Sequence, residues 1–192
     1  RRREPCASAI TRLTGELMSN TNQITGAQKC RFDDSILIVI DIQQRLGDAM
    51  PGKVLNRVLQ NTALLGRAAS LLEVPVMHTE QYPQGLGATH ELVTAALPEG
   101  RKYFAKTAFS CMNADGFPAA IAGIGRRQAV LVGMEAHICV LQTALDLHAT
   151  GAEVFVVEDA ICSRRLENYQ NALDRLRASG VNIVSAESVV FE

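Results

Sequence analysis

The chain has 192 residues, of which 47% are hydrophobic and 20% charged, and its formal net charge is −1. This length and composition are typical of one soluble globular domain with a substantial core. The near-neutral charge and the absence of tryptophan argue against a nucleic-acid partner, and no apolar run approaches the roughly 20 residues that a membrane span needs.

Cysteine usage indicates free thiols. The five cysteines form an odd set that contains no CxxC motif and no Cys/His pair at zinc-binding spacing. In a chain of this size, this pattern favours a reducing compartment over a disulfide scaffold. We therefore expect a cytoplasmic protein.

Residues 1–30 differ from the remainder of the sequence. They begin with the basic run Arg1–Arg3, lack an initial Met, and include the polar stretch Thr21–Lys29, which has no clear period. The acidic residues Glu4 and Glu16 are unusual for a transit peptide. We interpret residues 1–30 as a disordered or appended arm rather than a targeting signal, and residues 31–192 as the folded domain.

From Phe32 onward, the pattern becomes regular. The run from Ser35 to Ile40 fits a strand buried on both faces of a parallel sheet, and a helical period follows Pro51 as far as Leu71. Val74–Thr79 predicts a second strand, and the stretch from Gln81 to Ala88, which contains proline and glycine, predicts a loop. Further strands are expected near Lys102–Ala105 and at Ala129–Val132, Glu153–Val157 and Val181–Val184, with helices at Glu91–Ala96, Phe117–Ile124, His137–Thr150 and Glu167–Ser179.

This alternation of strands and helices indicates βαβ units, and therefore an α/β fold with a parallel sheet flanked by helices. No internal repeat or interdomain linker interrupts it after residue 30. The turn after the first strand, Asp41–Gly47, lacks the glycine fingerprint of a dinucleotide-binding site. A flavin or dinucleotide cofactor is therefore not expected.

Three chemically capable residues come at or near predicted strand ends: Asp41, Lys106 and Cys139. The carboxyl ends of parallel strands form the ligand crevice of such sheets. Cys139 would lie in the first turn of a helix, where the helix dipole lowers a thiol pKa. Together the three residues suggest a base, an electrostatic helper and a nucleophile.

Each of the three also has a structural explanation when taken alone. Asp41 could cap a helix, Lys106 could be a solvated surface lysine, and Cys139 could be a small buried hydrophobe. Six further residues are candidates for a substrate pocket, namely His78, Gln81, Tyr82, Phe109, His137 and Ile138. For these, hydrogen-bonded structural roles or simple packing remain open alternatives.

Five segments, in this order, resemble the isochorismatase-like cysteine hydrolases. They are LIVIDIQ at 37–43, TEQYPQGLG at 79–87, KTAFS at 106–110, GMEAHICV at 133–140 and DAICSR at 159–164. The second and fourth segments are most similar to the functionally unassigned isochorismatase domain-containing branch. The resemblance implies a Rossmann-like three-layer fold with a six-stranded parallel sheet and a homo-oligomeric protein.

The resemblance also implies a mechanism. The family's Asp-Lys-Cys triad would fall on Asp41, Lys106 and Cys139, and a cis peptide would join Met134 to Glu135. The backbone N–H groups of Glu135 and Cys139 would then form an oxyanion hole. The implied reaction is hydrolysis of a C–N bond in a small amide-like substrate through a covalent thioester. A catalytically quiet scaffold or interaction protein is the alternative.

Two departures from the family pattern bear on this reading. Nicotinamidases of the superfamily carry histidine metal ligands after the first strand, whereas the stretch from Leu46 to Gln60 contains no histidine. We therefore expect no metal and no other cofactor. Related chains usually continue with a C-terminal helix, so we expect the end of this chain, at Glu192, to be truncated or poor in helix.

Overall fold

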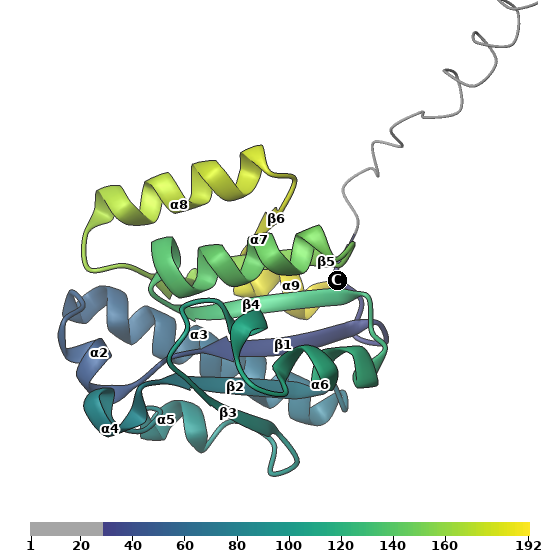
Figure 1. Ribbon diagram of the computed structural model, residues 1–192, viewed down its shortest axis with the longest axis horizontal. Helices are drawn as coiled ribbons and strands as arrows, with labels where there is room; N and C mark the ends of the chain where they lie inside the picture. Colours follow the sequence, from purple (N-terminus) through teal and green to yellow (C-terminus); the bar gives the residue numbers. More distant parts are fainter. Residues whose placement is uncertain (1–28) are drawn as a thin grey trace, which may run out of the picture.

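Six parallel strands form the centre of the fold (Figure 1). The computed structural model describes residues 29–192, so most of the arm predicted for residues 1–30 lies outside the described residues. The strands are arranged in the order β3-β2-β1-β4-β5-β6, and all neighbours pair in parallel. They are β1 (Ser35–Ile40), β2 (Val76–Gln81), β3 (Lys102–Lys106), β4 (Gln128–Met134), β5 (Glu153–Cys162) and β6 (Asn182–Val184). The predicted six-stranded parallel α/β fold is therefore confirmed.

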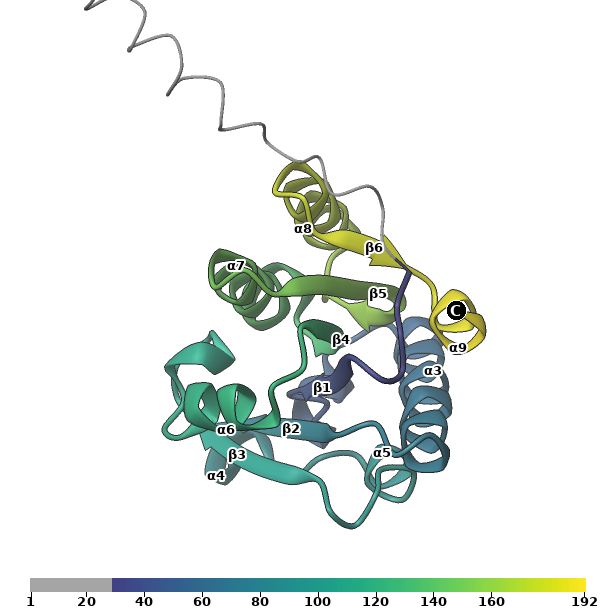
Figure 2. The same ribbon diagram turned by 90° about the vertical axis from the view of Figure 1, so that its right-hand side faces the viewer.

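Helices cover both faces of the sheet. The helical segments are α2 (Gln44–Asp48), α3 (Gly52–Leu71), α4 (Pro83–Leu86), α5 (Glu91–Thr94), η1 (Cys111–Asn113), α6 (Phe117–Ile124), η2 (Ala136–Val140), α7 (Leu141–Ala149), α8 (Leu166–Ala178) and α9 (Ala186–Phe191). Figure 2 shows α3, α5 and α9 on one face and α6, α7 and α8 on the other. The arrangement therefore has three layers.

The strand β1 shows why the sequence reads as a continuous apolar run. Ile36, Ile38 and Ile40 belong to the core beneath α6 and α7, whereas Leu37 and Val39 belong to the core beneath α3. Successive side chains of a strand point to opposite faces, and here both faces are buried. Every residue of β1 is accordingly buried.

Several predicted boundaries are wrong in detail. The strand β5 ends at Cys162 rather than Val157, because it passes an irregularity in its pairing with β4 and then resumes at Ile161. The predicted loop between Gln81 and Ala88 contains the short helix α4. The predicted helix from His137 begins as a π-helical turn, η2, before α7 starts.

The C-terminal end is not poor in helix as expected. The helix α9 forms over Ala186–Phe191, and the Ser185 side chain caps it by accepting a hydrogen bond from the Ser188 N–H at 3.2 Å. Ala186 is buried in the core that α3 also lines. No helix within residues 29–192 combines the length and hydrophobicity needed to cross a bilayer.

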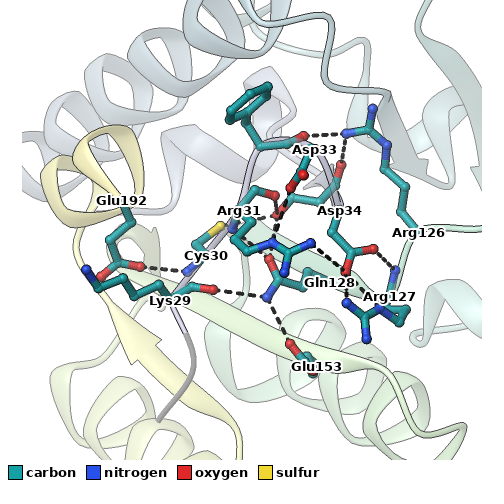
Figure 3. A network of polar contacts seen from close by, with 12 residues as sticks. Lys29, Cys30, Arg31, Asp33, Asp34, Arg126, Arg127, Gln128, Glu153 and Glu192 are labelled. Carbon is teal, nitrogen blue, oxygen red and sulfur yellow. Dashed lines mark hydrogen bonds and ion pairs between the residues drawn. The ribbon is translucent and has the colours of Figure 1, made fainter.

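The amino-terminal edge of the sheet carries a polar network around the buried side chain of Gln128 (Figure 3). The Gln128 amide donates to the Lys29 carbonyl at 3.0 Å and to Glu153 at 2.8 Å. Its oxygen accepts from the Arg31 N–H at 2.7 Å and from Ser35 Oγ at 3.1 Å. All four hydrogen-bonding positions of this amide are thus used.

Candidate active site

An ion pair between Asp41 and Lys106 lies at the opposite, carboxyl-terminal edge of the sheet. Asp41 follows β1 and Lys106 ends β3, and their side chains approach to 2.6 Å between Oδ2 and Nζ. Both side chains are 0% exposed. Asp41 has a backbone φ of 51°, a left-handed conformation that is uncommon outside glycine but enriched in Asp. The predicted meeting of these strand ends therefore occurs.

Thr79 fixes the second oxygen of Asp41. Its hydroxyl donates to Asp41 Oδ1 at 2.7 Å, and the Cys111 thiol lies 3.8 Å from the same hydroxyl. Thr79 and Cys111 are both buried. Neither residue was predicted to have a role, because a threonine or cysteine in an apolar segment has no sequence signal that distinguishes a role in the site from packing.

Lys106 Nζ is surrounded by acceptors besides Asp41. Gln81 Oε1 lies at 2.7 Å, the carbonyls of Phe109 and Ala108 at 3.1 and 3.3 Å, and Cys139 Sγ at 3.6 Å. Burial opposes protonation of the amine, but attraction to Asp41 and to Cys139 outweighs it, so the pKa of Lys106 is raised. The ammonium form is therefore the resting state.

Cys139 lies in the π-helical turn η2 and is 6% exposed. Burial, and secondly the negative charge of Asp41, raise the pKa of its thiol from 9.0 to about 12, although Lys106 opposes the shift. The expectation of a lowered pKa is therefore wrong. Desolvation and the adjacent carboxylate disfavour the thiolate more strongly than the lysine favours it.

The turn between β4 and η2 brings Glu135 to the site. The Met134–Glu135 peptide bond is cis, and a side chain at Gly133 would clash with the Ile40 carbonyl of the neighbouring strand. The buried Glu135 carboxylate accepts from Arg164 Nε and from the Arg164 backbone N–H, both at 3.0 Å. The turn is thus held against both β1 and the end of β5.

A cavity of about 130 Å³ opens beside the nucleophile candidate. Its wall is formed by four polar residues, Asp41, Gln81, Glu135 and Cys139, and by four apolar ones, Leu46, Leu86, Phe109 and Ile138. The predicted pocket residues Gln81, Phe109 and Ile138 are among them. Leu46 and Leu86 were missed, because they lie in short helices whose sequences show no apolar period.

The other three predicted pocket residues do not line this cavity. His78 projects from the face of β2 opposite to Thr79 and stacks on Tyr103 at 5.1 Å, and burial lowers its pKa. Tyr82 is 55% exposed and lines a neighbouring groove whose wall also includes Lys106. His137 is turned toward Ser163 and Asn168, with contacts of 2.9 and 3.2 Å. Strand alternation accounts for His78, local hydrogen bonds account for His137, and the exposure of the side chain accounts for Tyr82.

Glu80, which shares its face of β2 with His78, also has a structural role. One oxygen accepts from the Thr89 N–H at 2.6 Å and from the Thr89 hydroxyl at 2.8 Å, while the other accepts from the Tyr103 hydroxyl at 3.0 Å. This carboxylate therefore pairs with neighbouring protein groups. It does not line the cavity beside Cys139.

Sequence comparisons place the chain among known relatives. Residues 35–188 match the isochorismatase domain family model. Isochorismatase domain-containing protein 1 of Danio rerio is 38% identical over 159 residues, which is 82% of this chain but only 54% of that relative. Isochorismatase domain-containing protein 2 of the same organism is 36% identical over 170 residues, or 88% of this chain and 83% of the relative. The chain thus spans about half the length of the first of these relatives.

Solved structures agree with this assignment. A structure described as the MAR1 ribonuclease of Caenorhabditis elegans superposes with a TM-score of 0.79 at 32% identity, covering 85% of this chain and 83% of that one. The YcaC gene product of Escherichia coli, described as an octameric hydrolase of unknown specificity, has a TM-score of 0.78 at 24% identity over 86% of this chain and 82% of its own. The match to the family model and the identity to these relatives establish that the chain belongs to the isochorismatase domain family.

Proposed function

We propose that the chain is a cysteine hydrolase that cleaves a C–N bond of a small amide-like substrate through a thioester on Cys139. One observation carries the proposal: a fully buried Asp41–Lys106 ion pair lies beside the Cys139 thiol, 3.6 Å from Nζ to Sγ, where a small cavity opens. Burying two charges is costly, and such perturbed groups cluster at functional sites.

Acylation begins from a neutral thiol. Cys139 Sγ attacks the substrate carbonyl carbon while its proton passes to Asp41, so an S–C bond forms and the carbonyl π electrons move to oxygen. The Lys106 ammonium remains in place and compensates the single negative charge as it moves from Asp41 to sulfur and then to the carbonyl oxygen. The N–H groups of Glu135 and Cys139 would stabilise the oxyanion.

The tetrahedral intermediate then collapses. The carbonyl re-forms, the C–N bond breaks, and the leaving nitrogen takes the proton from Asp41 and departs as ammonia or an amine. Water, deprotonated by Asp41, attacks the thioester and releases the carboxylic acid, and sulfur recovers its proton. The balance is one amide and one water converted to one acid and one amine.

Other functions have less support. A scaffold role finds no supporting observation among the described residues. The ribonuclease activity named for the Caenorhabditis elegans neighbour is not extended to this chain, because the cavity of about 130 Å³ is smaller than the roughly 300–1,000 Å³ of pockets that enclose drug-sized ligands. The site also offers no unpaired cation to a phosphodiester, because Lys106 is engaged by Asp41 and Arg164 by Glu135.

We also propose that the protein assembles with copies of itself and acts in the cytoplasm. The Escherichia coli neighbour is described as octameric, which motivates measurement of the mass of this protein in solution by light scattering. Within residues 29–192, all four cysteines are free, which fits a reducing compartment.

The experiment is a measurement of ammonia release from small amides by wild type, Cys139→Ala and a matched control, Cys162→Ala. Cys162 is also buried with a thiol pKa raised by burial to about 12, but it lies at the end of β5 outside the cavity. We expect Cys139→Ala to lose turnover while keeping its thermal unfolding midpoint, and Cys162→Ala to remain active. Full activity of Cys139→Ala, or no turnover of any amide by wild type, would refute the proposal.

A further inference from the structure

We infer that the cavity beside Cys139 selects uncharged amides with a short apolar acyl group and rejects amides that carry a carboxylate. The inference rests on the proposed function, because it specifies the substrate of the same site. It follows from the charges, the apolar wall and the volume of the cavity.

Lys106, the cation of the site, has no N–H group left to donate to a substrate. An ammonium group carries three N–H bonds. Five acceptors already surround Lys106 Nζ within 3.6 Å: Asp41 Oδ2, Gln81 Oε1, the carbonyls of Ala108 and Phe109, and Cys139 Sγ. Its side chain is also fully buried. A substrate carboxylate therefore cannot pair with Lys106 unless it displaces Asp41 or Gln81.

The two nearby arginines lie outside the set of residues that line the cavity, as far as residues 29–192 are concerned. Arg164 is bound to Glu135 by its side chain and by its backbone N–H. Arg45 is exposed and donates to the Gly85 carbonyl at 2.6 Å. Each arginine is therefore engaged with a protein acceptor, and neither is among the residues that line the cavity.

The acidic residues that line the cavity are already neutralised by ion pairs. Asp41 and Glu135 are both buried, and their carboxylates pair with Lys106 and Arg164 respectively. A substrate carboxylate would therefore have to leave water without gaining an unpaired cation. An uncharged amide avoids that cost, since it needs only hydrogen bonds to its carbonyl and nitrogen.

The remaining wall and the volume define the acyl group. Leu46, Leu86, Phe109 and Ile138 come from four different segments and provide an apolar surface. The volume of about 130 Å³ is slightly below that of an engineered cavity of roughly 150 Å³ that holds benzene. An acyl chain of about six non-hydrogen atoms is therefore the largest that fits without rearrangement.

A pair of substrates with the same shape tests the inference. Isovaleramide and malonamate have matching branched skeletons, but malonamate carries a carboxylate where isovaleramide carries an isopropyl group. We expect wild type to release ammonia from isovaleramide with a kcat/KM at least about 100-fold higher, which corresponds to about 2.7 kcal/mol.

A substitution in the cavity wall can supply the cation that a substrate carboxylate lacks. Phe109 is 54% exposed, so Phe109→Arg can place a guanidinium at the cavity mouth without burying it in the core. We expect it to shift the preference toward malonamate by about tenfold, whereas Phe109→Leu should not. Leu71→Arg, at a position that is 84% exposed on α3 and outside the cavity lining, adds the same charge as a control and should leave the preference unchanged.

The outcomes separate the two claims. Equal or better hydrolysis of malonamate by wild type would overturn the selectivity and leave amide hydrolysis standing. An unchanged preference in Phe109→Arg, with isovaleramide still favoured by wild type, would overturn the assignment of that preference to charge at this wall. Hydrolysis of neither compound by wild type would contradict the proposed function itself, and the selectivity with it.

Discussion

The two ends of strands β1 and β4 both carry buried polar side chains, but of different kinds. At the amino end, Gln128 is neutral and all four of its hydrogen-bonding positions are used (Figure 3). At the carboxyl end, Asp41 and Lys106 are charged and have no exposed surface. The same sheet thus holds one network centred on a neutral amide and one centred on a buried ion pair.

The ion pair of the amino end reaches the surface. Arg127 pairs with Asp34, and their side chains are 66% and 13% exposed. Exposed pairs of this kind require little desolvation and contribute little stability. By contrast, a buried ion pair is often no more stabilising than an apolar pair of similar volume. The comparison supports the proposal that the carboxyl end keeps its buried charges for chemistry, whereas the amino end is organised for stability.

The largest expected effect comes from removing one of the buried charges. Asp41→Asn leaves the Lys106 ammonium buried without its carboxylate, which should lower the free energy of unfolding by about 3–5 kcal/mol. It also removes the base that accepts the thiol proton, so amide turnover should fall to background. Urea denaturation and an ammonia-release assay measure the two effects.

A double variant sharpens this result. Asp41→Asn combined with Lys106→Met removes both charges, and we expect it to recover much of the lost stability but none of the activity. Recovery of turnover in the double variant would contradict a catalytic role for the pair. If the single variant were as stable as wild type, the ion pair would not be the buried, mutually dependent unit described above.

Thr79→Val should affect the chemistry more than the fold. Valine matches the shape of the buried threonine but cannot donate to Asp41 Oδ1. A hydrogen bond to a charged group is worth about 1.5–3 kcal/mol, so kcat/KM should fall by roughly tenfold or more. Thr79→Ser, which restores the hydroxyl, should recover most of that loss. If serine failed to restore activity, packing rather than the hydrogen bond would explain the effect.

Gln128→Leu tests the opposite end of the sheet. Loss of the amide removes four hydrogen bonds and should cost about 1–3 kcal/mol in the free energy of unfolding. The value of kcat/KM should change by less than about twofold, since the site lies at the other end of the strands. A parallel loss of activity, measured below the unfolding transition, would show that the two ends are not independent.

Alkaline pH should weaken the fold gradually. Burial raises the pKa of the Cys111 thiol from 9.0 to about 11 and those of Cys139 and Cys162 to about 12. The unfolded chain ionises these thiols first, so their stabilising contribution is complete below about pH 9 and is lost as pH rises toward 11–12. Each thiol contributes a slope of at most about 1.4 kcal/mol per pH unit.

Denaturant titrations across that pH range measure this slope. Cys162→Ser removes one of the three thiols and should make the decline less steep by one thiol's share. An equally steep decline in this variant would indicate that Cys162 ionises equally readily in the folded and unfolded chains.

The sequence predicted the sheet well because its central strands are buried on both faces. The uninterrupted apolar run of β1 leaves few alternatives to a parallel strand, and the carboxyl ends of such strands must meet at one edge. That rule predicts that Asp41, Lys106 and Cys139 meet, and the Asp41–Lys106 ion pair and its contact with Cys139 agree with it. The family resemblance adds the roles that the three residues would have.

The cavity wall was harder to predict, since it depends on side-chain directions. His78 and Gln81 lie on the same strand, yet alternation turns Gln81 toward Lys106 and His78 toward Tyr103. The sequence shows that alternate residues of a strand share a face, but it does not show which of the two faces lines the site. Leu46 enters from a short helix without an apolar period.

The direction of the Cys139 pKa shift could not be obtained from its position in the chain. A helix start favours a thiolate, whereas burial and a nearby carboxylate disfavour it, and the outcome depends on three-dimensional distances. Here Asp41 and Cys139 share a single lysine. A thiolate is therefore accessible chiefly when Asp41 accepts the proton, which is the step that the proposed mechanism requires.

The central claim is that Cys139 carries the acyl group during turnover, and rapid-quench mass spectrometry tests it most directly. Wild type mixed with isovaleramide and quenched in acid during turnover should gain the mass of one isovaleryl group less one hydrogen. Peptide mapping should place this group on Cys139, and Cys139→Ala should show none. Turnover that leaves Cys139 unmodified at every quench time, or an acyl group on another residue, would contradict the account.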